Sequence, residues 1–360
     1  VEDAFVQVAR YLHEGILDYV ERLTSTFDDP LDTAILTCTG SEANDIALRM
    51  TEGMTGKRGI IATDATYHGN TTLVSHLSRN NVPEVGFGLG EYLRHVEAPD
   101  SYRIDDPKGE RFAAHVQAAV DDLEASGIGF AALIVCPLFL NEGFPMQDEG
   151  WLKPAAEVVR KAGGLLICDE VQSGFGRSGS HFWAYQKQGV TPDIVCLGKP
   201  MGNGHPVAGV VTTSAIMERF RTAFRYFNTF GGNPVSCAAA MAVLDELEDR
   251  DLQAHAAKMG RLAFERLSAL AEKYEVIGDV RQAGMVFGCE YVLDRETKTP
   301  ASDYADRIIN AMRQRGIILS KLGRHKNTLK IRPPMPFAEE HLDLLIETLD
   351  AAMAETPVAA

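Results

Sequence analysis

The sequence predicts an α/β protein: a large domain with a mostly parallel sheet flanked by helices, followed by a smaller C-terminal α+β domain. Over roughly the first 275 residues, short and almost uniformly apolar runs alternate with stretches of helical periodicity. That alternation is typical of a parallel sheet buried on both faces. After this point the regular alternation is lost. We therefore expect two domains, residues 1–275 and 276–360.

The elements follow in order from this pattern. Apolar residues recur every three or four positions from Val1 to about Leu23, which predicts a helix. Six apolar runs predict the strands of the large domain, at 34–38, 59–62, 131–135, 165–168, 194–197 and 207–211. Helices are predicted at 41–50, 112–124, 151–161, from Pro234 and at 252–273, with a glycine- and proline-rich loop at 82–110. The C-terminal domain should hold strands at 285–292 and 329–332, a helix at 304–313 and a last helix.

Composition excludes several classes of function. The chain has 35 basic and 50 acidic residues and a formal net charge of −15, which argues against a nucleic-acid or anionic-membrane partner. It contains no run of 18 apolar residues, as a membrane-spanning helix needs, and its first residues lack the features of a signal peptide. Its six cysteines form no CxxC pair and no zinc-type cluster, so we expect buried thiols and no metal. We expect a soluble, cytoplasmic protein.

Two segments at strand ends suggest sites for an anion and a ring. Residues 39–44, Thr-Gly-Ser-Glu-Ala-Asn, turn from a strand into a helix, whose first N–H groups suit a phosphate. A plain helix cap is the alternative. Asp169 ends a strand that should be buried, where an unpaired carboxylate is costly, so we expect a cationic partner rather than a solvated carboxylate. An ATPase is disfavoured, because residues 53–58 lack P-loop spacing.

Two further segments offer an amine and a hydroxyl. Lys199 directly follows an apolar strand and lies among glycines, where loss of water favours the neutral amine that forms imines. The alternative is a lysine that extends from a loop into solvent. Thr229, in the polar turn 228–234, offers a hydroxyl to a phosphate, although the turn is unremarkable alone. Tyr67, beyond the strand at 59–62, is a candidate to cover an aromatic ring, and core packing is its alternative.

These segments together match the requirements of pyridoxal phosphate. The cofactor needs a phosphate site, a carboxylate that keeps its pyridine nitrogen protonated, and a lysine that forms an imine with its aldehyde. Residues 174–179 match the dinucleotide pattern GxGxxG, but they do not turn directly from a strand into a helix. Nicotinamide binding is therefore disfavoured.

With these residues in hand, the chain resembles the class III pyridoxal-phosphate-dependent aminotransferases of fold type I over essentially its whole length. The resemblance rests on residues 40–44, 67–69, 169–172, 198–199 and 229–234. It implies pyridoxal 5′-phosphate as the cofactor and Lys199 as the residue that forms the imine and then moves the proton. It further implies that Asp169 pairs with the ring nitrogen. The remaining implied contacts are Gly40 and Ser41 at the phosphate, Tyr67 and Val171 on opposite ring faces, His68 beside Tyr67, and Gln172 at the phenolic oxygen. Thr229 comes from the neighbouring subunit in this family, so a homodimer with shared sites is implied.

The chain also departs from the family. Members normally begin with several dozen more residues, which line the substrate pocket, whereas this chain starts inside a later helix. Members that act on amino acids usually carry an arginine three residues before a Pro-Pro pair. Here that residue is Lys330, with Arg332 adjacent to the prolines, and lysine lacks the bidentate fork that suits a carboxylate. A glutamate that masks this arginine in some members is replaced by Asn141, with Glu142 next to it.

With these departures and with residues 181–184 and 198–206, the chain resembles one branch of the family. That branch contains alanine–glyoxylate-type aminotransferases and ammonia-releasing phospholyases. We expect an aminotransferase that moves an amino group from an amine or amino acid to a keto acid, with Lys330 and Arg332 binding the substrate. The alternative is a phospholyase acting on a phosphorylated amine such as phosphoethanolamine, because lysine suits a phosphate. A catalytically silent protein that keeps the cofactor fold is a third, non-enzymatic reading.

Overall fold

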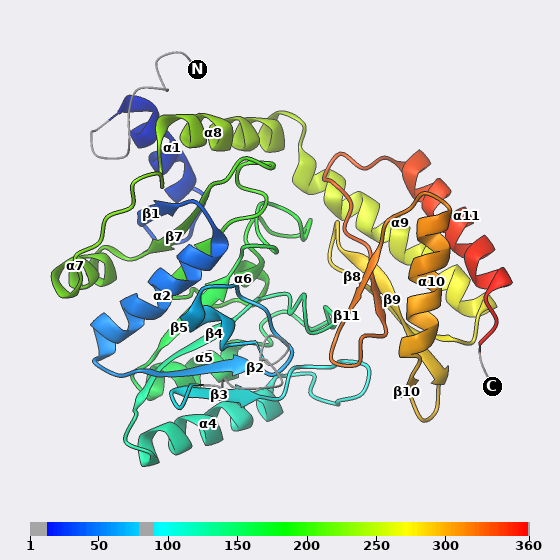
Figure 1. Cartoon of the computed structure of the whole chain (residues 1–360), viewed down its shortest axis with the longest axis horizontal. Coiled ribbons are helices and arrows are strands. Elements are labelled where there is room, and N and C mark those ends of the chain that lie inside the picture. Colours follow the sequence, from blue (N-terminus) through cyan, green and yellow to red (C-terminus); the bar gives the residue numbers. More distant parts are fainter. Residues whose placement is uncertain (1–12, 79–89, 359–360) are drawn as a thin grey trace.

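The computed structural model describes residues 13–78 and 90–358, and its main feature is a seven-stranded sheet (Figure 1). The strands are β1 (Thr33–Thr37), β2 (Gly59–Thr63), β3 (Leu93–Val96), β4 (Phe130–Val135), β5 (Leu165–Asp169), β6 (Ile194–Leu197) and β7 (Ala208–Thr212). Their order in the sheet is β1-β7-β6-β5-β4-β2-β3. Only β7 runs antiparallel to its neighbours. The predicted mostly parallel sheet is confirmed.

Helices cover both faces of this sheet because successive strand residues point to opposite sides. In β5, Leu166 and Cys168 belong to one core and Ile167 to the other. The first core lies under α1 (Glu14–Thr24), α4 (Glu110–Ala125), α5 (Lys153–Lys161) and α8 (Pro234–Asp249), and the second under α2 (Gly40–Thr55) and α7 (Ser214–Ala223). Two one-turn helices, α3 (Thr72–Ser75) and α6 (Ala184–Lys187), lie in the connections.

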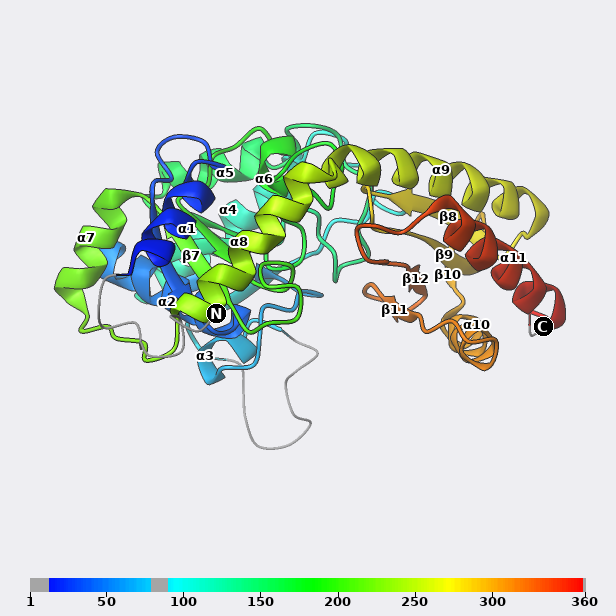
Figure 2. The same cartoon turned by 90° about the horizontal axis from the view of Figure 1, so that it is seen from above.

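A second, antiparallel sheet follows α9 (Leu252–Lys273) and lies beside the larger unit (Figures 1 and 2). It contains β8 (Ile277–Gln282), β9 (Phe287–Asp294), β10 (Thr299–Pro300), β11 (Ser320–Leu322) and β12 (Thr328–Lys330). Together with α9, α10 (Ser302–Gln314) and α11 (Glu339–Glu355), it encloses a separate hydrophobic core. Helix α9 contributes residues 256–270 to that core, although it precedes the predicted domain division at residue 275. The division stays a prediction.

The predicted elements are present with shifted ends, and the structure adds some that the pattern did not predict. Strand β3 lies inside the predicted loop at 82–110; its central Arg94 and His95 break the apolar run that marks a buried strand. The predicted first helix is observed from Glu14, and its earlier part lies outside the described residues. Among the helices that the structure describes, none is long and apolar enough to cross a membrane.

Candidate functional site

A pocket of about 290 Å³ lies at the carboxyl-terminal edge of the large sheet. It is formed where β1, β2, β4, β5 and β6 end, which is where ligands bind in open α/β sheets. Residues from five connections therefore meet there although they are far apart in sequence. The lining includes the predicted residues Gly40, Ser41, Tyr67, His68, Asp169, Val171, Gln172 and Lys199.

The carboxylate of Asp169 is buried at the end of β5 and accepts hydrogen bonds from three donors, which leaves acceptor capacity for a further partner. Its Oδ2 accepts hydrogen bonds from Asn44 Nδ2 at 2.9 Å and from the His68 ring, whose Nδ1 lies at 2.6 Å. Its Oδ1 accepts from the backbone N–H of Val171 at 3.0 Å. The predicted cationic partner is therefore an imidazole, which is cationic only when protonated, supported by an amide.

The turn before α2 presents a helix N-terminus to the pocket. Thr39 caps α2: its hydroxyl accepts from the N–H of Glu42 at 3.2 Å, and its carbonyl accepts from the N–H of Ala43 at 3.1 Å. The glutamate side chain closes the capping box on the backbone of Thr39. Thr39 thus accepts hydrogen bonds from the third and fourth N–H groups of α2. The first two N–H groups, those of Gly40 and Ser41, remain free to bind an anion.

Glycine at position 40 lets the start of α2 pack closely against Val171 at the pocket. A Cβ there would lie 2.9 Å from both Cγ atoms of Val171, closer than carbon atoms pack. A Cβ on Gly69, which has a φ of +143°, would lie 2.5 Å from the hydroxyl of Ser41. These two glycines let the helix N-terminus and the Tyr67–Gly69 loop approach the same point.

Lys199 lies at the mouth of the pocket and is exposed to solvent. The sequence argument expected this amine to be shielded from water. The described residues of the chain alone do not provide that shielding. Lys199 and Gln172 also line an adjacent cleft of about 680 Å³. The side-chain nitrogen of Gln172 is buried and has no hydrogen-bond partner among the described residues.

The adjacent cleft is rich in positive charge. Arg332 and Arg177 line it with Lys199. Lys330, at the end of β12, is half-buried and lines neither this cleft nor the pocket, but it is near enough to Arg332 and Lys199 to feel their charges. Burial, then the charge of Arg332, lowers its pKa from 10.5 to about 8. Among the described residues, none of these four cations forms an ion pair with an acidic side chain. In a chain with a net charge of −15, four cations without acidic partners indicate affinity for an anion.

Thr229 does not line the pocket of its own chain. It is exposed in the turn before α8, next to Phe230, whose surface is 65% exposed. Its predicted role at the phosphate depends on a neighbouring subunit and stays a prediction.

The sequence argument gave no role to three residues that lie at or near the site. Asn44 contacts both Asp169 and the carbonyl of His68; its position three residues after Ser41, on the same face of a helix, was the available signal. Arg177 lay within the GxGxxG pattern that was judged irrelevant. Glu142 is buried against Thr63 and lines a separate small cavity beside the second sheet, and nothing in its local sequence marks it as buried.

Comparison with known proteins agrees with this geometry. The model of the family "Aminotransferase class-III" matches residues 2–353. A Drosophila melanogaster protein named alanine–glyoxylate aminotransferase 2-like is 39% identical over 96% of this chain and 73% of its own length. A Caenorhabditis elegans protein named ethanolamine-phosphate phospho-lyase homolog 1 is 35% identical over 96% of this chain and 77% of its own. The solved structure of an Arthrobacter phospholyase in complex with phosphoethanolamine is 40% identical, with a TM-score of 0.93, and covers 99% of this chain and 85% of its own.

Proposed function

The chain belongs to the class III aminotransferase family, and on that premise we propose that its pocket binds pyridoxal 5′-phosphate and uses it to move amino groups. One observation carries the proposal: a helix N-terminus, a buried carboxylate and a lysine from three distant segments line one pocket of about 290 Å³. These are the anchors that the phosphate, the ring nitrogen and the aldehyde of the cofactor require. The predicted fold and family are confirmed, and the individual residue roles are proposals.

The groups in the pocket fit the cofactor. The buried side-chain nitrogen of Gln172 and the side-chain oxygen of Asn44 lack partners among the described residues, as expected of groups that face a polar ligand. Glycines at positions 40 and 69 let the start of α2 and the Tyr67–Gly69 loop pack closely against Val171 and Ser41, because a Cβ at either glycine would collide with them. Val171 and Tyr67 both line the pocket, and we propose that a flat ring lies between them.

Each residue then has a physical role. The first N–H groups of α2 and the hydroxyl of Ser41 bind the phosphate, while Asp169 holds a proton on the pyridine nitrogen. When bound, the cofactor supplies an aldehyde and an aromatic ring that withdraws electrons from the substrate's α-carbon. Lys199 would hold the cofactor through its aldehyde, with loss of water, and its amine, when free, would move a proton as a general base. An amine or amino acid donates the amino group, and a keto acid accepts it.

The positive charge of the cleft supports an anionic substrate, and it also supports a second candidate activity. We propose that Lys330 and Arg332 bind the carboxylate or phosphate of the substrate, with support from the positive charge of Arg177, which lines the same cleft as Arg332. The ammonium group of lysine is a compact point charge and cannot bind a carboxylate through two parallel hydrogen bonds as arginine does. This favours a phosphate as the group that Lys330 binds. The Arthrobacter relative, described as a phospholyase with phosphoethanolamine, favours the same substrate class. Ammonia-releasing cleavage of a phosphorylated amine is therefore the second candidate.

A product assay separates the two activities. The purified protein with pyridoxal phosphate is incubated with alanine, simple amines or phosphoethanolamine, each with and without a keto acid. Transamination gives a new amino acid only when the keto acid is present, whereas the lyase releases phosphate and ammonia without it. Failure of every donor to yield either product would remove both proposals.

The lowered pKa of Lys330 predicts a pH dependence for anionic substrates. In the free protein its ammonium loses its charge as the pH rises through about 8, so kcat/KM should fall above this pH. The fall approaches about tenfold per pH unit where this charge is essential, and a propylamine donor, which has no anionic group, should not show it. Lys330→Arg keeps its charge over this range and should remove the fall. An unchanged fall in that variant would refute the assignment.

We also propose that the protein acts as a homodimer in the cytoplasm. Thr229 and Phe230 are exposed in the turn that the family resemblance assigns to the subunit interface, which supports a dimer. All six cysteines are free thiols, which suits a reducing compartment. Light scattering during gel filtration measures the first proposal directly.

A further inference from the structure

The loop between β3 and α4 is bound to the second sheet by polar contacts that the proposed chemistry does not use. Arg103 of this loop forms an ion pair with Glu290, which is buried in the middle of β9, and its Nη2 donates to the carbonyl of Lys298 at 2.8 Å. In return, Nζ of Lys298 donates to the carbonyl of Tyr102 at 2.6 Å. The hydroxyl of Tyr102 lies against β8, since a Cβ on Gly278 would be 2.8 Å from it. The loop is therefore in direct contact with both β8 and β9.

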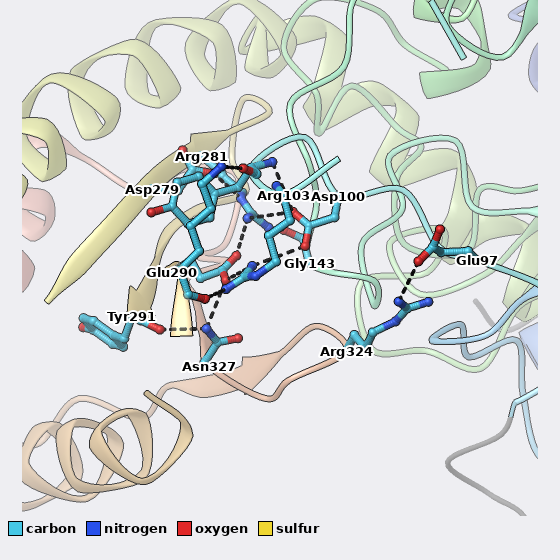
Figure 3. Close-up of polar contacts among 12 residues, drawn as sticks. Glu97, Asp100, Arg103, Gly143, Asp279, Arg281, Glu290, Tyr291, Arg324 and Asn327 are labelled. Carbon is cyan, nitrogen blue, oxygen red and sulfur yellow. Dashed lines mark hydrogen bonds and ion pairs between the residues drawn. The ribbon is translucent and has the colours of Figure 1, made fainter. Parts of the chain in front are cut away.

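The carboxylate of Glu290 also binds the start of β12, the strand that ends at Lys330. Its Oε1 accepts a hydrogen bond at 3.0 Å from the side-chain amide of Asn327, which directly precedes β12. Its Oε2 pairs with the buried Arg281, whose Nη1 donates to the carbonyl of Gly143 at 2.7 Å (Figure 3). One buried carboxylate thus connects β8, β9 and β12 with the loop after β3 and the connection after β4.

The turn between β11 and β12 is fixed to the large sheet as well. The N–H of Gly323 donates to the carbonyl of Asn141 at 3.1 Å. Arg324 forms ion pairs with Asp64 and with Glu97, the latter at 3.1 Å and visible in Figure 3. Asp64, Glu97 and Asn141 follow β2, β3 and β4, so the segment that leads into β12 lies at the carboxyl-terminal edge of the large sheet.

The placement of β12 decides where the ammonium of Lys330 lies. Side chains alternate along a strand, so Thr328 and Lys330 share one face of β12. This face is turned toward the large sheet, because a Cβ on Gly143 would lie 3.8 Å from Oγ1 of Thr328. Lys330 is near enough to Lys199 to feel its charge. Among the described residues it has no acidic partner that could hold its ammonium in place independently of its strand.

We propose that Arg103 is a positioning residue for the anionic group of the substrate. Through its ion pair with Glu290 it holds β12 against the large sheet, and this sets the distance from Lys330 to the pocket. A shift of about 1 Å in a binding group can cost up to about a hundredfold in rate, even when the cause lies far from the reacting atoms. This inference rests on the proposed function, because it is there that Lys330 is proposed to bind the substrate.

The first test compares Arg103→Met with wild type on two kinds of donor. Phosphoethanolamine and alanine carry an anionic group, whereas propylamine does not. In the variant, the ratio of kcat/KM for an anionic donor to kcat/KM for propylamine should fall about tenfold, mainly through a higher KM for the anionic donor. Arg103→Lys keeps a charge that can pair with Glu290 and should restore most of the ratio. An unchanged ratio in Arg103→Met would overturn the inference.

Arg295 offers a matched control, because its contacts stay within the second unit. It follows β9, lies 3.5 Å from the carboxylate of Glu275, and donates to the carbonyl of Ile277 at 3.1 Å. Arg295→Met should therefore lower Tm without moving β12 relative to the large sheet, and should keep the wild-type ratio. An equal fall of the ratio in both variants would mean that it follows general stability, which is incompatible with a positioning role.

A double substitution tests the link between Arg103 and Lys330. In Lys330→Met the group that Arg103 is proposed to position is absent. Adding Arg103→Met to this variant should therefore lower the ratio by less than it does in the wild-type background. Equal losses in the two backgrounds would show that the residues act independently and would contradict the proposal.

Hydrogen exchange tests the placement of the strand without cofactor or substrate. The N–H of Gly323 bonds to Asn141 across the two sheets, so its protection from exchange reports their contact. In the cofactor-free protein, a peptide covering residues 320–324 should exchange faster in Arg103→Met and at the wild-type rate in Arg295→Met. Wild-type exchange in Arg103→Met would refute the inference and leave the proposed function untouched. Failure of wild type to turn over any donor would refute the proposed function alone, because the exchange measurement does not depend on it.

Discussion

Replacement of Lys199 by alanine is expected to lower turnover about 10,000-fold or more, the largest effect of any substitution in the chain. The amine would both bind the cofactor covalently and move the proton, so its loss removes general-base catalysis, worth about 100- to 10,000-fold, and the covalent step as well. Lys199 is exposed and forms no ion pair with the described residues, so folding should be unaffected. Steady-state rates with the best donor from the product assay measure the loss.

Borohydride reduction separates the covalent role from a general loss of activity. Reduction of the loaded wild-type protein should fix one cofactor per chain, and peptide mass spectrometry should locate it on Lys199. The Lys199→Ala protein should carry none. Lys258→Ala, which removes an exposed lysine from the middle of α9, should label and turn over as wild type does. A fixed cofactor on any lysine other than Lys199 would contradict the assignment.

The strands at the centre of the large sheet were predictable because their environment is uniform. β4, with the sequence Phe-Ala-Ala-Leu-Ile-Val, is buried on both faces, so every position must be apolar and the pattern is unmistakable. The same property made Asp169 conspicuous, since a carboxylate at the end of a buried strand needs a reason. Residues that follow parallel strands also meet at one edge, which allowed the pocket to be predicted from separate motifs.

The features that escaped prediction depend on tertiary contacts. β8 keeps polar residues along its length because Asp279 and Arg281 pair with each other, and pairing makes burial of a charge tolerable. No local pattern marks such a strand. Glu142 was unremarkable as one glutamate in a loop; its burial follows from the second sheet holding both neighbouring carbonyls. Contacts between segments 138 or more residues apart leave no trace in the periodicity of either one.

Replacement of Asp169 by asparagine is the second large effect, expected to lower kcat by about 100- to 1,000-fold, as for loss of one preorganised electrostatic contact in other active sites. Asparagine has the same shape but no charge to hold a proton on the ring nitrogen. Its amide NH2 would also face a donor, because the two oxygens of Asp169 accept from Asn44 and His68 on one side and from Val171 on the other. We therefore expect weaker cofactor binding and a lower Tm together with the loss of kcat.

A matched substitution separates the electrostatic effect from the structural one. Asp193 lies just before β6, is half-buried and also accepts a backbone hydrogen bond, from the N–H of Leu166 at 2.8 Å, but it does not line the pocket. Asp193→Asn should lower Tm to a similar degree and leave kcat unchanged. If the two variants lose stability alike and only Asp169→Asn loses turnover, the missing charge at the ring nitrogen is the cause. Turnover of Asp169→Asn within about tenfold of wild type would mean that this carboxylate does not serve the cofactor ring.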